Sequence, residues 1–248
     1  ALRATLERHE KEVAAMENEL ARHKEQSDQL LYELAVNIAH QVRNPLGIIQ
    51  ATAQTSSKKK WFSKKDAESQ ARILRSVESL ARRLEEIIDF CRPLSLQLAR
   101  FPVSRLLGEV GLLIEEHCKN RSIEYILENS LPEYEIMADQ DRLRIVLLVI
   151  LFNAMEAMPI GGKIAVTIES RYKEGQIVVQ IKDTGIGIRP EHMGMLTHPF
   201  FTTKPGGVGL GLAIAKRILR AHKGDLAIAS VLGHGTTVEL ILPMGKSE

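Results

Sequence analysis

Hydrophobic positions in the N-terminal third of the chain recur in alternating steps of three and four residues. The first series has Glu, Lys and Arg between its members, which are Leu6, His9, Val13, Met16, Leu20, His23, Ser27, Leu30 and Leu34. This spacing is a heptad repeat and predicts a coiled coil, which the polar seam positions should weaken. We interpret residues 1–30 as a coiled-coil signal helix that transmits a register or rotation. Because the chain begins at Ala1 in mid-pattern, we expect an upstream sensor domain to be missing from it.

The repeat changes phase after Leu31, and two amphipathic helices follow. The stripe of the first contains Leu31, Ile38, Val42, Leu46 and Ile49, and a polar stretch from Thr55 to Lys65 ends it. The second runs to about Cys91, with Ile73, Val77, Leu80, Leu84 and Ile87 at heptad spacing. A hairpin of two such helices cannot close a core alone, so we expect residues 31–95 to form a homodimer with a four-helix bundle.

The pattern switches to alternating strands and helices beyond Arg92-Pro93, where proline ends the second helix. Lys163–Glu169 and Gln176–Lys182 alternate like strands, and the glycines gather in two clusters late in the chain. We therefore predict an α/β domain over residues 96–248, joined to an α-helical hairpin domain.

Composition and charge exclude several classes of function. The formal net charge of the 248-residue chain is +2, so nothing global indicates a nucleic-acid partner. The two cysteines, Cys91 and Cys118, have no metal or redox spacing and fit a reducing compartment. The longest apolar runs are far too short to cross a bilayer. We expect a cytoplasmic location for this portion of the protein.

His40 lies opposite the predicted apolar stripe of the first helix. At about 100° per residue it is about 200° from Ile38, while Asn44 lies one turn further on the same face. A single helical histidine most often has no chemical role, but this one is close to Pro45, which removes a backbone hydrogen bond and favours a bend. A neutral, exposed imidazole is a competent nucleophile. It could attack the γ-phosphate of ATP if the chain also contained an ATP site.

Three stretches of the second domain would form such a site. Asn153 lies on an apolar helix and could direct an amide oxygen at a metal, or simply face solvent. Asp183 ends a strand and is followed by Gly185 and Gly187, so its carboxylate could accept a hydrogen bond from the adenine amine while the glycines let the base approach. The strongest signal is the glycine cluster over residues 206–211 that leads into a helix, because it aims backbone N–H groups at an anion. Lys204, just before it, is a mobile cation.

These motifs resemble, in order, those of sensor histidine kinases. The segment His40-Gln41-Val42-Arg43-Asn44-Pro45-Leu46 is similar to the family's phosphoacceptor box. The asparagine box, DxGxG box, lid phenylalanine and GxGxG box match Asn153, Asp183-Thr184-Gly185-Ile186-Gly187, Phe200-Phe201 and Gly207-Val208-Gly209-Leu210-Gly211. The terminal GHGTTVELILP resembles the closing strand, with Thr236 near the adenine. The resemblance covers roughly residues 31–244.

The resemblance implies a dimeric helical hairpin and a two-layer α/β sandwich of the Bergerat ATPase type that binds Mg²⁺ and ATP. It implies that His40 is phosphorylated and passes the phosphoryl group to an aspartate in the receiver domain of a response regulator. Gln41 would adjoin the reacting imidazole, and Asn44 would orient a water for phosphatase activity. Asn153 would be the metal ligand. The implied nucleotide contacts are Asn153, Ala157, Asp183, Gly185, Gly187, Ile188, Lys204, Gly207, Val208, Gly209, Leu210, Gly211 and Thr236.

Two residues depart from the family pattern. Gln41 replaces the usual glutamate, and an amide cannot take a proton from the attacking imidazole. Val149 replaces a second asparagine that binds metal in many members, and water would substitute for it. These departures support one alternative, a degenerate kinase that serves as a nucleotide-binding signalling scaffold. Another Bergerat-type ATPase, such as a chaperone, topoisomerase or serine kinase, is a third hypothesis, and the hairpin with His40 argues against it.

Overall fold

The computed structural model describes residues 16, 19, 29–30, 32–53, 64–128, 134–204 and 207–244. The predicted coiled-coil helix over residues 1–30 therefore lies almost entirely outside the described residues. The chain divides into two compact units, Ala1–Pro93 and Leu94–Glu248, and each is described by itself. Within the described ranges, no helix combines the length and the apolar character needed to span a membrane.

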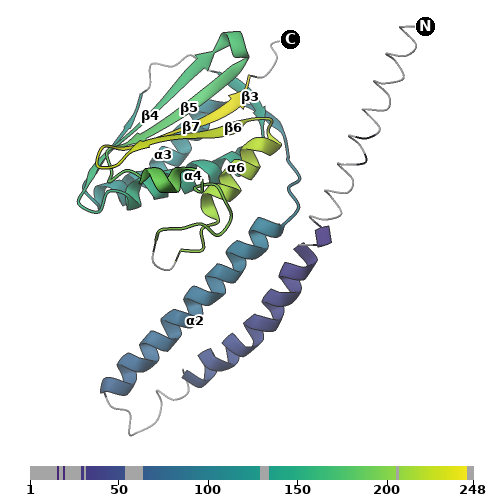
Figure 1. Ribbon diagram of the computed structural model, residues 1–248, viewed down its shortest axis with the longest axis vertical. Coiled ribbons are helices and arrows are strands. Elements are labelled where there is room, and N and C mark those ends of the chain that lie inside the picture. Colours follow the sequence, from purple (N-terminus) through teal and green to yellow (C-terminus); the bar gives the residue numbers. More distant parts are fainter. Residues whose placement is uncertain are drawn as a thin grey trace. The chain divides into compact units, whose positions relative to one another are not determined.

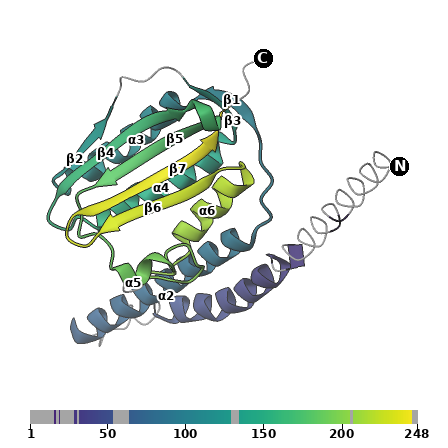
Figure 2. The ribbon, with the colours of Figure 1, turned by 45° about the horizontal axis from the view of Figure 1, so that its top comes forward.

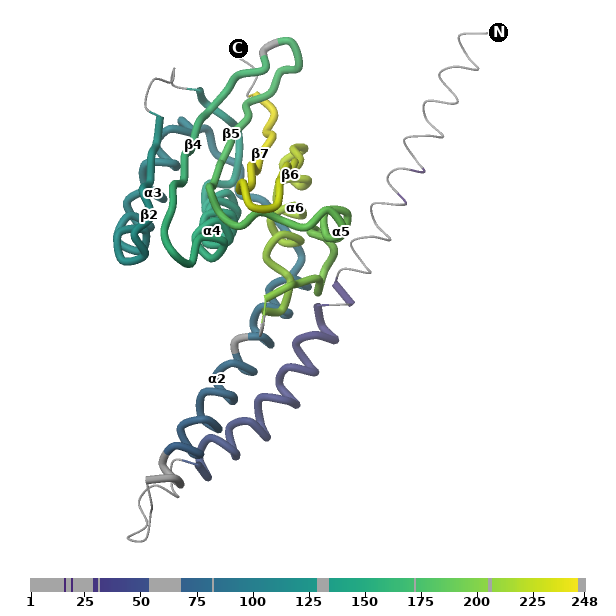
Figure 3. Tube along the Cα trace, turned by 60° about the vertical axis from the view of Figure 1, so that its left-hand side comes forward, coloured from purple at the N-terminus to yellow at the C-terminus, as the bar shows by residue number. Residues whose placement is uncertain are grey.

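The first unit is a helical hairpin. Residues 32–53 are helical, with no break at Pro45, and α2 (Lys64–Cys91) runs beside them in the opposite direction (Figures 1 and 3). The Arg43 guanidinium donates a hydrogen bond to the Glu85 carboxylate across the hairpin, and the Gln70 side chain donates to the Ala53 carbonyl. These contacts fix which faces of the two helices meet.

The buried face of the single hairpin includes only part of the predicted stripe. Ala39 and Leu46 are buried between the helices together with Val77, but Ile38 is 56% exposed and Ile49 is 45% exposed. The small Ala39 side chain suits a close approach of the two helices, and Ile38 is then directed elsewhere. Apolar side chains are thus left uncovered on the hairpin, and they include Leu34, Ile38, Ile49, Ile73 and Leu80.

The second unit contains two sheets (Figures 1 and 2). A small antiparallel sheet pairs β1 (Ala99–Pro102) with β3 (Glu135–Ala138). The main five-stranded sheet has the order β2-β4-β5-β7-β6, and only β2 and β4 are parallel. Its strands are β2 (Ile123–Leu127), β4 (Gly162–Arg171), β5 (Gln176–Asp183), β6 (Asp225–Val231) and β7 (Gly235–Pro243). The predicted strands at Lys163–Glu169 and Gln176–Lys182 are confirmed.

Helices cover one face of the main sheet, and in Figure 2 they lie behind the strands. They are α3 (Val103–Lys119), α4 (Gln140–Glu156) and α6 (Gly211–Ala221), and the short α5 (Pro190–Met193) and a 3₁₀ turn (Tyr172–Glu174) lie in connections. The core between the two layers includes Val146, Ile164, Ile177, Ala215 and Leu219, each with no exposed surface. The predicted combination of a helical hairpin with a two-layer α/β sandwich is confirmed.

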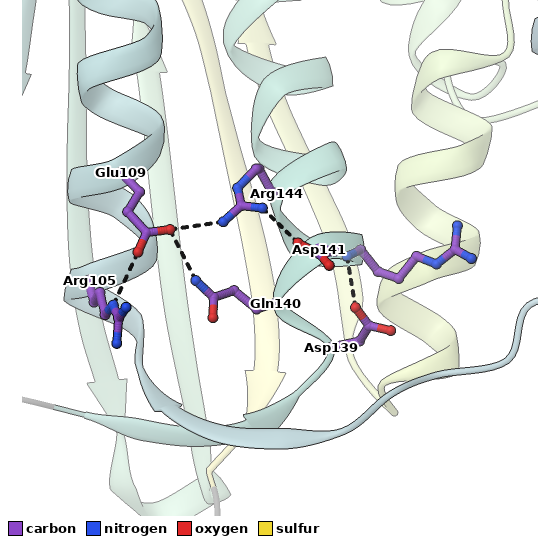
Figure 4. Close-up of polar contacts among 7 residues, drawn as sticks. Arg105, Glu109, Asp139, Gln140, Asp141 and Arg144 are labelled. Carbon is purple, nitrogen blue, oxygen red and sulfur yellow. Dashed lines mark hydrogen bonds and ion pairs between the residues drawn. The ribbon is translucent and has the colours of Figure 1, made fainter.

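Polar contacts join α3 to the start of α4 (Figure 4). The Glu109 carboxylate accepts hydrogen bonds from Arg144 at 2.9 Å, Arg105 at 3.1 Å and Gln140 at 3.1 Å. Its hydrogen bonds to Arg144 and then Arg105 lower the pKa of Glu109. Arg144 also donates to Asp141 on its own helix at 2.6 Å, so its guanidinium bridges one carboxylate on each of the two helices.

Asp139, immediately before α4, anchors the segment that enters the second unit. Its carboxylate accepts the backbone N–H of Arg142 at 3.0 Å, which caps α4, and that of Gln97 at 2.8 Å. The Asp139 backbone N–H donates to His222 Nε2 at 2.9 Å, so the other ring nitrogen, 2.8 Å from the Ile218 carbonyl oxygen, carries the proton. These hydrogen bonds connect α4 and α6 with the segment that contains Gln97.

Candidate active site

Asp183 is a buried carboxylate at the end of β5. Its side chain is buried, and Oδ1 accepts the backbone N–H of Gly185 at 2.8 Å and that of Thr236 at 3.1 Å. Burial raises the pKa of Asp183 and outweighs these two hydrogen bonds, which lower it. Both bonds use the same oxygen, so Oδ2 is left for a further donor, such as an exocyclic amine.

The turn after Asp183 packs against the C-terminal end of α4. The Ile186 backbone N–H donates to the Ala157 carbonyl at 3.0 Å. A Cβ on Gly185 would be 2.7 Å from the same carbonyl oxygen. Gly187 has a φ of +67°, and a Cβ there would be 2.2 Å from the Val231 carbonyl oxygen. Glycine is therefore required at both positions, and it keeps the wall beside Asp183 thin enough for a flat ligand.

Ser230 on β6 holds the other side of this turn, and the sequence interpretation did not include it. Its hydroxyl accepts the Ile188 backbone N–H at 2.9 Å and donates to the Gly235 carbonyl at 2.9 Å. The Thr236 hydroxyl is also 2.9 Å from it. Ser230 thus connects the predicted residues Ile188 and Thr236. No local pattern marks its contact with the turn, because Ile188 is 42 residues away in the sequence.

The glycine loop leads into α6 as predicted. Gly209 has a φ of +76°, and a Cβ there would be 2.5 Å from the Phe201 carbonyl oxygen. The N-terminus of α6 has no side-chain cap and no acidic residue in its first turn. Such a helix end is suited to binding an anion. Leu210 is buried, whereas Gly207, Val208 and Gly211 are at least partly exposed.

Lys204, Asn153 and Glu156 meet at one point. The Lys204 ammonium donates to Asn153 Oδ1 at 2.6 Å and forms an ion pair with the Glu156 carboxylate. The structure therefore joins the predicted phosphate-binding cation to the predicted metal ligand. The donor set fits Mg²⁺, which prefers oxygen ligands and usually keeps several waters. Among the described residues no group of three or more His, Cys, Asp or Glu could hold a metal, so the remaining ligands would come from phosphates and water.

Val149 borders the glycine loop from α4. A Cβ on Gly211 would be 3.2 Å from Val149 Cγ1. The residue that departs from the family pattern therefore packs against the core and also borders the start of α6, where the glycine loop ends. An apolar side chain here supplies no oxygen to a metal.

His40 is exposed on its helix, beside the buried Ala39. Gln41 and Asn44 are exposed as well, and both belong to the hairpin unit. The structure thus leaves the imidazole accessible within its own unit. The catalytic roles given to these three residues stay predictions, as do the individual nucleotide contacts.

Comparison with known families agrees with this division of the chain. Residues 30–90 match the His Kinase A (phospho-acceptor) domain. Residues 138–246 match the histidine kinase-, DNA gyrase B- and HSP90-like ATPase family. The chain belongs to the histidine kinase family. This confirms the resemblance found in the motifs, and the phospho-acceptor match contradicts the third hypothesis of another Bergerat-type ATPase.

Named relatives of this histidine kinase are similar over most of its length. It is 34% identical to the signal transduction histidine-protein kinase AtoS of Escherichia coli (strain K12), over 86% of this chain and 35% of AtoS. It is 31% identical to sporulation kinase C of Bacillus subtilis (strain 168), over 96% of this chain and 55% of that kinase. The chain thus spans about a third to a half of the length of these curated relatives.

Solved structures of histidine kinase ThkA share the fold. The ThkA catalytic domain is 30% identical, with a TM-score of 0.54, over 60% of this chain and 96% of that one. ThkA in complex with the response regulator protein TrrA is 26% identical, with a TM-score of 0.67, over 94% of this chain and 67% of that one.

Proposed function

We propose that this chain is the catalytic core of a two-component histidine kinase that phosphorylates its own His40 with ATP. The observation that carries the proposal is the presence on one chain of an exposed histidine in a phospho-acceptor hairpin and a buried Asp183 beside an open helix N-terminus. The first supplies a nucleophile and the second reads adenine while the helix end holds phosphates. Neither unit alone accounts for both features.

Residues of the ATPase-type unit would bind and orient the nucleotide. Asp183 Oδ2 accepts the adenine amine, and the turn of Gly185 and Gly187 lies along the base. Backbone N–H groups from Gly207 to Gly211 and the α6 N-terminus hold the phosphates, with the Lys204 ammonium. Asn153 Oδ1 would hold Mg²⁺, whose charge would stabilise the negative charge of the phosphoryl group.

His40 would then react as a nucleophile. Its Nε2 attacks the γ-phosphorus, the bond to the bridging oxygen breaks, and ADP leaves. The proton on Nδ1 passes to water, because the amide of Gln41 has no basic oxygen to receive it. The phosphohistidine next gives its phosphoryl group to an aspartate carboxylate of a response regulator. ThkA, a relative with the same fold, is described in complex with such a regulator.

Asn44 would support the reverse regulatory activity. It lies one helical turn from His40 and is exposed. An amide there can hold a water for hydrolysis of the regulator's acyl phosphate. Loss of phosphatase activity with retained autophosphorylation in Asn44→Ala is the expected result.

The hairpin unit would work as a homodimer. The apolar surface of Leu34, Ile38, Ile49, Ile73 and Leu80 remains uncovered within one chain. Pairing with a second copy would bury it in a four-helix bundle.

Labelling with ATP carrying ³²P at the γ-position tests the proposal. We expect a phosphoprotein that is labile in acid and stable in base, absent from His40→Ala and present in His117→Ala. His40→Ala should still bind an adenine nucleotide, whereas Asp183→Asn should bind it more weakly and incorporate less label. Intact nucleotide binding without label in the wild-type protein would instead support the scaffold.

A further inference from the structure

The last turn of α4 attracts a cation. Asn153 and Glu156 are three residues apart, so their side chains project from the same face of the helix. The C-terminal end of a helix carries partial negative charge, and no basic residue lies in the last turn of α4. The positive charge comes instead from Lys204, 48 residues away in sequence from Glu156.

The Lys204 ammonium marks where two oxygen ligands converge. Its Nζ is 2.6 Å from Asn153 Oδ1 and also contacts Glu156 Oε2. Mg²⁺ binds oxygen at about 2.0–2.1 Å, so modest movement of two side chains would bring both oxygens to a metal ion at this point. Both charged side chains are about half exposed, at 46% for Lys204 and 49% for Glu156, and are free to adjust.

We propose that Glu156 is a second protein ligand of the nucleotide's Mg²⁺, beside Asn153, and that the Lys204 ammonium holds this position until nucleotide arrives. Lys204 then turns from the two oxygens to the phosphates. This inference rests on the proposed function, since it assigns a further ligand to the same nucleotide site. It also accounts for the apolar Val149 beside the glycine loop, because the second oxygen comes from the following turn of α4.

This exchange of cations gives both the lysine and the carboxylate a role. Without nucleotide, Lys204 neutralises Glu156 and satisfies Asn153. With nucleotide, Mg²⁺ takes over the two oxygens, and the released ammonium neutralises phosphate charge. The net charge around the helix end thus stays balanced in both states.

Metal affinity, measured apart from catalysis, tests the assignment. Free Mn²⁺ is counted by electron paramagnetic resonance while it is titrated into protein saturated with the β,γ-imido analogue of ATP. We expect Glu156→Gln to weaken Mn²⁺ binding by about tenfold or more, as ligand-sphere changes do. Glu156→Asp, which keeps the carboxylate, should lose less. Asp141→Asn serves as the matched control, because it removes one exposed carboxylate from the opposite end of α4 and should change nothing.

Binding of the analogue in EDTA distinguishes a metal ligand from a residue that only pairs with Lys204. If Glu156 ligates the metal, the affinity of Glu156→Gln for metal-free analogue should not fall. Unchanged Mn²⁺ affinity in Glu156→Gln would mean that the carboxylate only pairs with Lys204, and would overturn the inference while leaving the proposed function intact. Failure of the wild-type protein to bind the analogue at all would overturn both.

Discussion

At the scale of single residues, two buried aspartates have opposite roles. Hydrogen bonds from Gln97 and Arg142 outweigh the burial that raises the pKa of Asp139, so its pKa is lowered. For Asp183, burial prevails over its hydrogen bonds, so its pKa is raised. A carboxylate that folding stabilises is typical of a structural anchor, whereas one whose charged form burial destabilises is a candidate for a binding site.

This difference predicts opposite dependences of stability on pH. A raised pKa means that the folded state binds the proton more tightly, so the contribution of Asp183 to stability falls as pH rises from the ordinary carboxyl value through the raised one. The lowered pKa of Asp139 means that its contribution is present above the ordinary value and is lost as pH falls through the lowered one. The free energy of unfolding, measured with denaturant at several pH values, should therefore change relative to the wild-type protein. As pH rises, it should increase relative to wild type for Asp183→Asn and decrease for Asp139→Asn.

The same two variants should differ in nucleotide binding. Asp183→Asn should weaken adenine nucleotide binding roughly 10- to 100-fold, the size of a charge-assisted hydrogen bond. Asp139→Asn should bind nucleotide like the wild-type protein once folded. Equal effects of both substitutions on binding would show that Asp183 serves only the fold.

We expect Gln41 to make autophosphorylation slow. Its amide can only accept or donate a hydrogen bond, while a carboxylate could take the Nδ1 proton as His40 attacks. Gln41→Glu should accelerate autophosphorylation by about 10²-fold, the lower end of the usual contribution of a general base. The measurement is the initial rate of ³²P incorporation under saturating ATP. Gln41→Ala should keep the wild-type rate; a large loss in that variant would assign the amide itself a part in the reaction.

At the scale of elements, the turn between β5 and α5 depends on a glycine that faces backbone. Gly187 and Gly175 have φ values of +67° and +63°, but only at Gly187 would a Cβ meet the chain, 2.2 Å from the Val231 carbonyl oxygen. Gly175→Ala should destabilise the fold by roughly 1–2 kcal/mol, the strain of a left-handed alanine. Gly187→Ala should cost more and also abolish nucleotide binding, because the turn must move away from β6. Calorimetric unfolding and nucleotide titration of the two variants test this; equal stability and equal binding would contradict it.

Elements with strong local patterns were predictable, and contacts between distant segments were not. Strands β4 and β5 alternate along the sequence, and Asp183 falls where the second one ends. The role of Ser230 was not predictable, because its hydrogen bond to Ile188 joins residues 42 positions apart. The spacing of three residues between Asn153 and Glu156 is visible in the sequence. Only the position of Lys204 shows that the two side chains converge. Ile38 of the predicted stripe is exposed in the single chain, because an amphipathic pattern does not tell a face that meets its own hairpin partner from one left for another chain.

At the scale of the whole molecule, the uncovered surface of the hairpin makes association testable. Ile73 and Leu80 on α2 are 46% and 45% exposed in the single chain, and they lie at heptad spacing on one face. In a symmetric dimer each substitution acts twice, and burying one leucine contributes about 1.5–3 kcal/mol. Leu80→Lys should therefore raise the dimer dissociation constant at least ~100-fold, as measured by sedimentation. Leu112→Lys, at an exposed leucine of α3 in the other unit, should leave dimerisation unchanged. A dimer that tolerates Leu80→Lys would show that this face of α2 lies outside the interface, while a weakened dimer that still binds nucleotide would show that the two units keep separate tasks.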